Sequence, residues 1–189
     1  MNRNLIIRDY LVSAQAVLAK IEPESIGRAI AIIEDTYRAG KGLYIFGNGG
    51  SAADAQHMAA ELVGRYKRER KAIRSVALTT NTSSVTAIGN DYGYDAVFEK
   101  QLEIIFSPGD AVLGISASGN SRNVLNGVQY ARERGGRVIS MTGFDGGKLP
   151  SLSEANVHVP FSEFGLVEDM HLLIGHIIMT SMKIFIKTY

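Results

Sequence analysis

Cysteine is absent from this chain of 189 residues, which excludes disulfide bonds, redox-active cysteine pairs and thiolate metal sites. A chain without cysteine fits a reducing compartment. Long apolar runs are absent as well: no window approaches the roughly eighteen uninterrupted apolar residues of a membrane span. The N-terminal Met1–Leu5 also lacks the apolar core of a signal peptide. We therefore expect a soluble, cytoplasmic protein with no membrane partner.

An excess of charge of one sign is also missing. Lys and Arg number 20 and Asp and Glu 19, so the formal net charge is only +1. This balance gives no general attraction to nucleic acid, and we expect no nucleic-acid partner. The one dense charge cluster, Arg65–Arg74, is interpreted as a solvated loop in preference to a basic contact surface.

The hydrophobic pattern predicts one domain over residues 1–189, long enough for a single core. The N-terminal segment 1–40 has apolar residues at helical spacing and predicts two helices, 5–20 and 23–40. Gly42–Phe46 follows as a continuously apolar strand, which is typical of a buried parallel strand. Further strands are expected at 73–78, 110–115, 137–142 and 155–159, and further helices at 52–66, 82–89, 95–106, 122–134 and 166–186. This alternation predicts an α/β fold: a three-layer, doubly wound parallel sheet with helices on both faces.

Two loops rich in glycine and serine, Gly47–Ser51 and Ser116–Ser121, each join a predicted strand to a predicted helix. Ligands of such sheets bind at the carboxyl ends of the strands, and a helix N-terminus offers unpaired N–H groups to an anion. Ser51 is explained equally well as a hydroxyl donor to a ligand or as the cap of its helix. The second loop holds three serines, more than one cap requires. We predict a phosphate site formed by both loops.

A nucleotide site is the weaker interpretation of the same loops. Gly47–Ala52 matches the pattern G-x-G-x-x-A, but a dinucleotide site also needs an acidic residue near the end of the next strand, and Val76–Asn81 has none. Neither Gly47–Ala52 nor Gly143–Leu149 matches the Walker A pattern.

Acidic and basic side chains follow the first loop. Asp54, His57 and Glu61 are three and four residues apart, so all three share one face of the predicted helix. His57 and Glu61 can bind one divalent metal or act as an acid–base pair, although an ordinary hydrogen-bonded pair on an exposed face has the same spacing. Their position beside the predicted phosphate loop favours the functional interpretation. His171 and His176 interrupt the apolar final helix, where a histidine is more often a core or interface residue.

Together these residues resemble the sugar isomerase (SIS) domain family and, within it, the bacterial phosphoheptose isomerases. The resemblance spans nearly the whole chain. Its motifs are Gly47–Ser51, Asp54–Arg65, Gly89–Asp91, Gly114–Ser121, Thr142–Gly143 with Gly146–Lys148, and Glu168–His171 with His176.

The resemblance implies interconversion of sedoheptulose 7-phosphate and D-glycero-D-manno-heptose 7-phosphate through an enediol, for lipopolysaccharide or other surface glycans. It implies Glu61 as the base that moves a proton between C1 and C2, and His176 as the partner acid–base group. It also implies zinc, held by His57, Glu61, Glu168 and His176, which would polarise the ketose carbonyl. The implied substrate contacts are Asn48, Gly49, Gly50, Ser51, Asn90, Asp91, Ser116, Ser118 and Ser121.

Two positions depart from the family pattern. Glu168 stands where the family has glutamine and adds a negative charge to the zinc site, and Ala117 replaces a common threonine and removes one hydroxyl. Glu168 and His176 are eight residues apart, about 12 Å of rise in an ideal helix. They can share an ion only if Glu168 precedes the helix or belongs to another subunit. The resemblance implies a homotetramer with sites at subunit interfaces, and the apolar N-terminal helix is compatible with packing in one.

A different class of function remains as the alternative. Related SIS proteins bind sugar phosphates as regulators, or contact a replication-initiation protein, without catalysis. The presence of His57, Glu61 and His176 together favours an enzyme.

Overall fold

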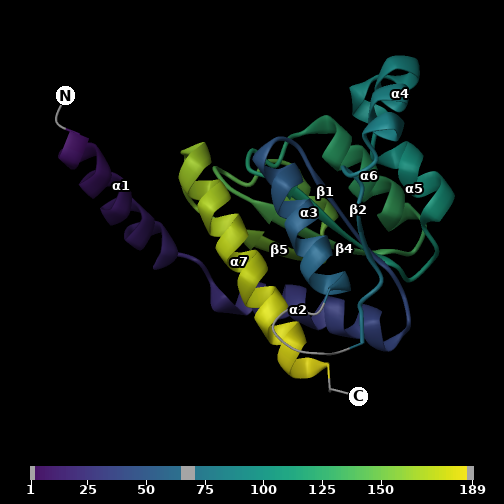
Figure 1. The fold of residues 1–189 in the computed structure, drawn as a ribbon, viewed down its shortest axis with the longest axis horizontal. Coiled ribbons are helices and arrows are strands. Elements are labelled where there is room, and N and C mark those ends of the chain that lie inside the picture. The colour runs from purple at the N-terminus through teal and green to yellow at the C-terminus, as the bar shows by residue number, and fades with distance from the viewer. Residues whose placement is uncertain (1–2, 65–70, 187–189) are drawn as a thin grey trace.

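Five parallel strands form one sheet within residues 3–64 and 71–186, the part of the chain that this computed structural model describes (Figure 1). Their order is β2-β1-β3-β4-β5, and all neighbouring strands run parallel. The chain passes from β1 to one edge, returns to β3 and continues to the other edge, so the boundary between β1 and β3 is the topological switch point. The strands are β1 (Leu43–Gly47), β2 (Ser75–Ala77), β3 (Ala111–Ser116), β4 (Arg137–Thr142) and β5 (Ala155–His158).

Helices cover both faces of the sheet, because successive side chains of each strand point to opposite faces. Leu43 and Ile45 of β1 join the apolar cluster with α2, α3 and α7, whereas Tyr44 and Phe46 join the cluster with α5 and α6. The predicted three-layer, doubly wound fold is confirmed. The helices are α1 (Arg3–Leu18), α2 (Pro23–Arg38), α3 (Gly50–Val63), α4 (Thr82–Tyr92), α5 (Glu99–Ile105), α6 (Arg122–Glu133) and α7 (Phe164–Phe185).

Most helix boundaries differ from the prediction by one to three residues, and one predicted helix is divided. α3 begins at Gly50, two residues early, and α4 extends to Tyr92. The helix expected at 95–106 is split into the 3-10 turn η1 (Tyr94–Ala96) and α5. Gly93 ends α4 with φ +87, a conformation that breaks the helix and that glycine adopts without a steric penalty.

Residues 65–70 of the charge cluster Arg65–Arg74 lie outside the described residues, so the interpretation of that cluster stays a prediction. Among the described helices, none combines the length and the apolar character needed to cross a membrane.

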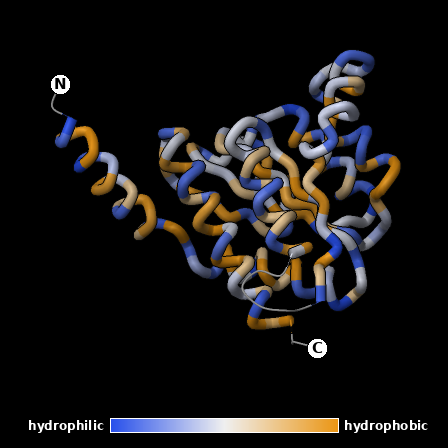
Figure 2. Tube along the Cα trace, viewed as in Figure 1, coloured by the Kyte–Doolittle hydropathy of each residue, from blue (hydrophilic) through white to orange (hydrophobic). Residues whose placement is uncertain are grey.

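Helix α1 projects away from the sheet and its covering helices (Figure 1). Apolar residues recur along its length (Figure 2), yet only Val17 is buried. Leu11 is 60% exposed and Val12 57% exposed. A groove of about 730 Å³ separates α1 from the start of α7, and the hydroxyl of Tyr10 donates to Asp169 Oδ2 at 2.7 Å. The helix therefore presents an uncovered apolar surface.

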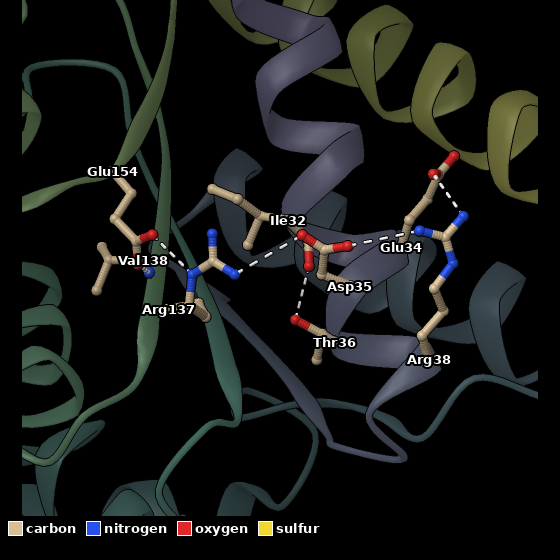
Figure 3. A network of polar contacts seen from close by, with 8 residues as sticks. All are labelled: Ile32, Glu34, Asp35, Thr36, Arg38, Arg137, Val138 and Glu154. Atoms are coloured by element: carbon tan, nitrogen blue, oxygen red, sulfur yellow. Dashed lines mark hydrogen bonds and ion pairs between the residues drawn. The ribbon is translucent and has the colours of Figure 1, made fainter.

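A polar network connects α2 to the amino end of β4 in the sheet (Figure 3). Arg137, at the start of β4, donates from Nε to Glu154 Oε2 at 2.6 Å and lies 4.0 Å from Asp35 of α2. Glu154 Oε1 also accepts from the backbone N–H of Val138 at 3.1 Å. These contacts lie at the amino end of β4, so the carboxyl end of the sheet remains open for a site.

His171 fixes α7 to the carboxyl end of β4. Its side chain is fully buried, and Nε2 lies 3.2 Å from the carbonyl oxygen of Thr142. Because a carbonyl only accepts, Nε2 carries the proton and the imidazole is neutral. Burial lowers the pKa of His171 to about 4.

We expect His171 to make the stability of the protein depend on pH between about 6.5 and 4. The unfolded chain binds a proton near the ordinary pKa, whereas the native state binds it only near pH 4, so stability falls as the pH falls through this window. The variant His171→Gln keeps an N–H donor but does not titrate. In urea unfolding at pH 7 and pH 5, the wild type should lose about 2 kcal/mol more than the variant. Parallel losses in the two proteins would contradict this assignment.

Candidate active site

The two glycine- and serine-rich loops open side by side at the switch point. Gly47 ends β1 and pairs in register with Ile115 of β3. From there the chain enters α3 on one face of the sheet and α6 on the other. The N-termini of these two helices therefore lie next to each other at the carboxyl edge of the sheet, where ligands bind in such folds.

The first loop provides no side-chain cap for the start of α3. A Cβ atom on Gly47 would lie 2.6 Å from Ser51 Cβ and 2.7 Å from the Ile115 oxygen, so this close approach requires glycine. Gly49 occupies the N-cap position with φ +55 and forms no side-chain cap bond. Ser51 is not the cap: it is 4% exposed and sits in the first helical turn. The uncapped N–H groups of α3 are suited to an anion.

The second loop brings two hydroxyls to the start of α6. Ser116 donates to Ser121 Oγ at 3.0 Å, and Ser121, at the N-cap position, makes no side-chain cap bond. The Ser118 hydroxyl accepts from the backbone N–H of Asn120 at 3.2 Å. A second uncapped helix start thus meets the first, together with hydroxyl groups that can donate to an oxyanion.

An amide pair that sequence reasoning missed joins the two loops. Asn48 of the first loop and Asn123 of α6 exchange two hydrogen bonds, both 2.9 Å long. Tyr94 donates its hydroxyl to Asn48 Oδ1 at 2.9 Å. Asn123 is 2% exposed and lies on the stripe of α6 that also buries Val124 and Gly127, so a polar residue within an apolar stripe was the available signal. The Asn48 side chain, predicted to bind substrate, here holds the loops together.

Two histidines meet where α3 packs on α7. His57 Nε2 lies 3.1 Å from His176 Nε2, and the rings are perpendicular. Two nitrogens bound to one tetrahedral zinc ion at about 2.05 Å lie about 3.3 Å apart, so this pair fits the predicted metal. Glu61 is one turn beyond His57 on α3 and is half-buried. Glu61 is therefore the candidate third donor from the same helix.

Glu168 does not join this pair within one chain. It lies inside the continuous helix α7, so the option that it precedes the helix is excluded. Its carboxylate covers the start of α3 instead: a Cβ atom on Gly50 would lie 2.5 Å from Glu168 Oε2. Among the described residues no group of three or more His, Cys, Asp or Glu side chains is placed to hold a metal ion. Within the described residues, one chain therefore brings together the two histidines but no third metal donor.

Asp54 does not share the exposure of its helix neighbours. It is 8% exposed, whereas His57 is exposed, and its Oδ2 atom is buried with no hydrogen-bond partner in the described structure. Burial, and secondly the negative charge of Glu168, raise the pKa of Asp54 to about 6. The predicted common face therefore holds for His57 and Glu61 but directs Asp54 toward the core.

Asn90, Asp91 and Ala117 are the remaining positions that the sequence singled out. Asn90 and Asp91 are exposed near the end of α4, where Asn90 donates to Asp91 Oδ1 at 2.8 Å. None of the described α4 residues is buried. Their role in substrate binding stays a prediction. Ala117 is 7% exposed and packs in the apolar cluster that includes Met58 and Val167, so its methyl group faces α3 and α7.

Comparison with known proteins agrees with this arrangement. A family model for the SIS domain matches residues 9–143. The chain belongs to the SIS domain family. The phosphoheptose isomerase of Aliarcobacter butzleri is 47% identical over 178 residues, 93% of this chain and 94% of the relative.

Solved structures of proteins with the same name are also similar. The phosphoheptose isomerase from Neisseria gonorrhoeae superposes with a TM-score of 0.89 at 36% identity, covering 95% of this chain and 98% of that one. The phosphoheptose isomerase from Francisella tularensis gives 0.90 at 29% identity, with coverages of 95% and 97%. The expected resemblance to this group within the SIS family is confirmed.

The variant Gly47→Ala should destabilise the protein by about 1–3 kcal/mol, because the added methyl group forces β1, β3 and α3 apart. Gly27→Ala is the matched control: Gly27 is exposed inside α2, and no described atom lies within 4 Å of an added Cβ. The control should gain about 0.5–1 kcal/mol from better helix propensity. Urea unfolding measures both, and equal effects would refute the steric account of the first loop.

Proposed function

We propose that the protein is a phosphoheptose isomerase that interconverts sedoheptulose 7-phosphate and D-glycero-D-manno-heptose 7-phosphate. The observation that carries the proposal is the arrangement along α3, which starts at the anion-binding loops and leads to Glu61 and the pair of His57 with His176. An anion site and an acid–base site thus lie on one helix.

The spacing along α3 suits a long sugar. Seven residues separate Gly50 from His57, about 10 Å of helix rise. An extended seven-carbon chain with its phosphate at the loops spans this distance, whereas a three-carbon chain does not. The reacting C1 and C2 atoms of a heptose phosphate would then lie beside His57 and His176, and the Glu61 side chain, one turn further along α3, would extend back toward them.

Two side chains supply the proton transfers. Glu61 removes the proton from C1 of the ketose and returns it to C2, which yields the aldose through an enediol. His176 moves the proton that is exchanged between the two oxygens. The loops hold the phosphate through helix N-termini and the hydroxyls of Ser51, Ser116 and Ser121, and so position the carbon chain.

Zinc is part of the proposal. We assign His57 and His176 as two of its ligands, which the spacing of their imidazole nitrogens supports, and Glu61 as a third, although the described structure does not place it with them. Because Glu168 and His176 are eight residues apart within the helix α7, we assign the fourth position to Glu168 of a neighbouring subunit. When bound, the ion would polarise the ketose carbonyl and stabilise developing negative charge.

The family resemblance implies a homotetramer with active sites at its interfaces, and we include this assembly in the proposal. The uncovered apolar surface of α1 and the apolar groove beside it supply surface for subunit contacts. A metal set divided between subunits would make activity depend on that assembly. A cytoplasmic location and the supply of heptose to lipopolysaccharide or other surface glycans complete the proposal, supported by the absence of cysteine and by the phosphorylated substrate.

The variant Glu61→Gln should lose at least about 100-fold in kcat, because the amide cannot accept the C1 proton. Glu133→Gln, an exposed change on α6, is the control and should retain activity. The assay follows the conversion of sedoheptulose 7-phosphate by NMR in D₂O, in which solvent deuterium enters the product. Full activity of Glu61→Gln would refute the assignment. A wild-type protein that binds the sugar phosphate without turnover would favour the regulatory alternative.

Protein purified without chelator should contain about one zinc ion per chain, and His57→Ala should lose it, since one of the two converging nitrogens is removed. The control His158→Ala changes a histidine outside the proposed ligand set and should keep its metal. Elemental analysis gives the content, and chelation should abolish turnover. A metal-free protein whose activity survives chelation would contradict the zinc proposal.

A further inference from the structure

The second loop is held from behind by residues 143–149, here called the backing segment. Gly143 donates its N–H to the Ala117 oxygen at 2.8 Å. At the other end, Lys148 and Leu149 both donate to the Gly119 oxygen, each at 3.0 Å. The backing segment is therefore bonded to both halves of the loop that carries Ser116 and Ser121.

The two backbones touch with no side chain between them. A Cβ atom on Gly119 would overlap the carbonyl oxygen of Gly146, and one on Gly147 would overlap the carbonyl oxygen of Ser118. All three glycines have positive φ values, +63, +87 and +58 in chain order. The contact thus depends on glycine for both its close approach and its backbone conformation.

Phe144 shows that tertiary contacts hold the backing segment in its conformation beside the second loop. It is the only described non-glycine residue with positive φ, at +51. Such a conformation costs about 1–3 kcal/mol and persists only where the surroundings impose it. Here the Phe144 N–H donates to the Phe161 oxygen at 2.8 Å, and its ring packs on Phe164 at 4.7 Å. The segment is anchored at the start of α7.

Asn120 connects the loop to the backing segment through its side chain. Its Nδ2 donates to the Ser118 oxygen at 2.9 Å, and its Oδ1 accepts from the Lys148 N–H at 3.3 Å. Asn120 is exposed, so its truncation removes these bonds without leaving a cavity in the core.

We propose that the backing segment holds the second loop in its anion-binding shape, and that Asn120 and Gly147 are positioning residues for the phosphate, which neither of them touches. A loop of glycines and serines is costly to order. Bonds that order it in the absence of ligand reduce the entropy lost on binding and so raise affinity. Their loss should weaken anion binding and leave the proton transfers at Glu61 unchanged.

The test compares Asn120→Ala and Gly147→Ala with Gly135→Ala. Gly135 also has positive φ, +73, but no described atom lies within 4 Å of an added Cβ, so it reports the backbone strain alone. Calorimetric titration with inorganic phosphate gives the Kd, and steady-state kinetics with sedoheptulose 7-phosphate gives KM and kcat. Asn120→Ala should raise the Kd and KM together by about tenfold, the worth of one or two hydrogen bonds, with kcat within about twofold. Gly135→Ala should change neither constant, although it loses stability.

The kinetic part of this inference rests on the proposed function, and the titration does not. A wild type that binds phosphate in a manner dependent on Asn120 but turns over no sugar would overturn the proposed function alone. An Asn120→Ala protein with unchanged Kd and KM, or with a lowered kcat at unchanged Kd, would overturn the inference alone. A wild type that does not bind phosphate overturns it as well. If Gly147→Ala does not fold, Asn120→Ala decides the question.

Discussion

The pairing of β1 with β3 is the contact on which the rest of the site depends. Their register places Gly47 beside Ile115, and the chain leaves the two strands toward opposite faces of the sheet. Two helix N-termini are thereby brought to one place without either helix blocking the other. This proximity requires glycine at position 47, because the end of β1, the β3 backbone and Ser51 leave a space too small for a methyl group. The amide pair of Asn48 and Asn123 then holds the loops at that spacing.

Helix α7 adds the second half of the site by close packing on α3. A Cβ atom on Gly175 would lie 3.2 Å from Met58, so the two helices approach closely at this point. His57 precedes Met58 and His176 follows Gly175 in the sequence, and the two imidazoles meet beside that contact. The buried bond from His171 to Thr142 sets the position of α7 relative to the sheet. The histidine pair is thus a consequence of helix packing as well as of the residues themselves.

The sequence was sufficient to predict the parallel sheet and the location of the candidate site, because both depend on local sequence patterns. Continuous apolar runs such as Leu43–Gly47 indicated buried parallel strands, and loops of glycine and serine after them indicated an anion site. The start of α3 was misplaced since it depends on the backbone conformation of Gly49, which residue type does not specify. The pairing of Asn48 with Asn123 joins residues 75 positions apart, and the contact of Glu168 with Gly50 joins opposite ends of the chain. Such contacts follow from tertiary packing, so local patterns could not reveal them.

The phosphate end and the metal end of the proposed site differ in how many of their residues come from one chain. The loops, their bridging amides and the backing segment are all contacts within a single chain, so the proposed phosphate site is formed by one chain alone. The proposed metal end has His57, Glu61 and His176 in one chain, while Glu168 of that chain is held at the start of its own α3. A carboxylate there is stabilised by the helix dipole. Burial, and secondly this carboxylate, raise the pKa of Asp54. Under the proposed assignments binding and turnover are separable: binding would depend on the order of one loop, and turnover on a subunit that brings the remaining metal donor.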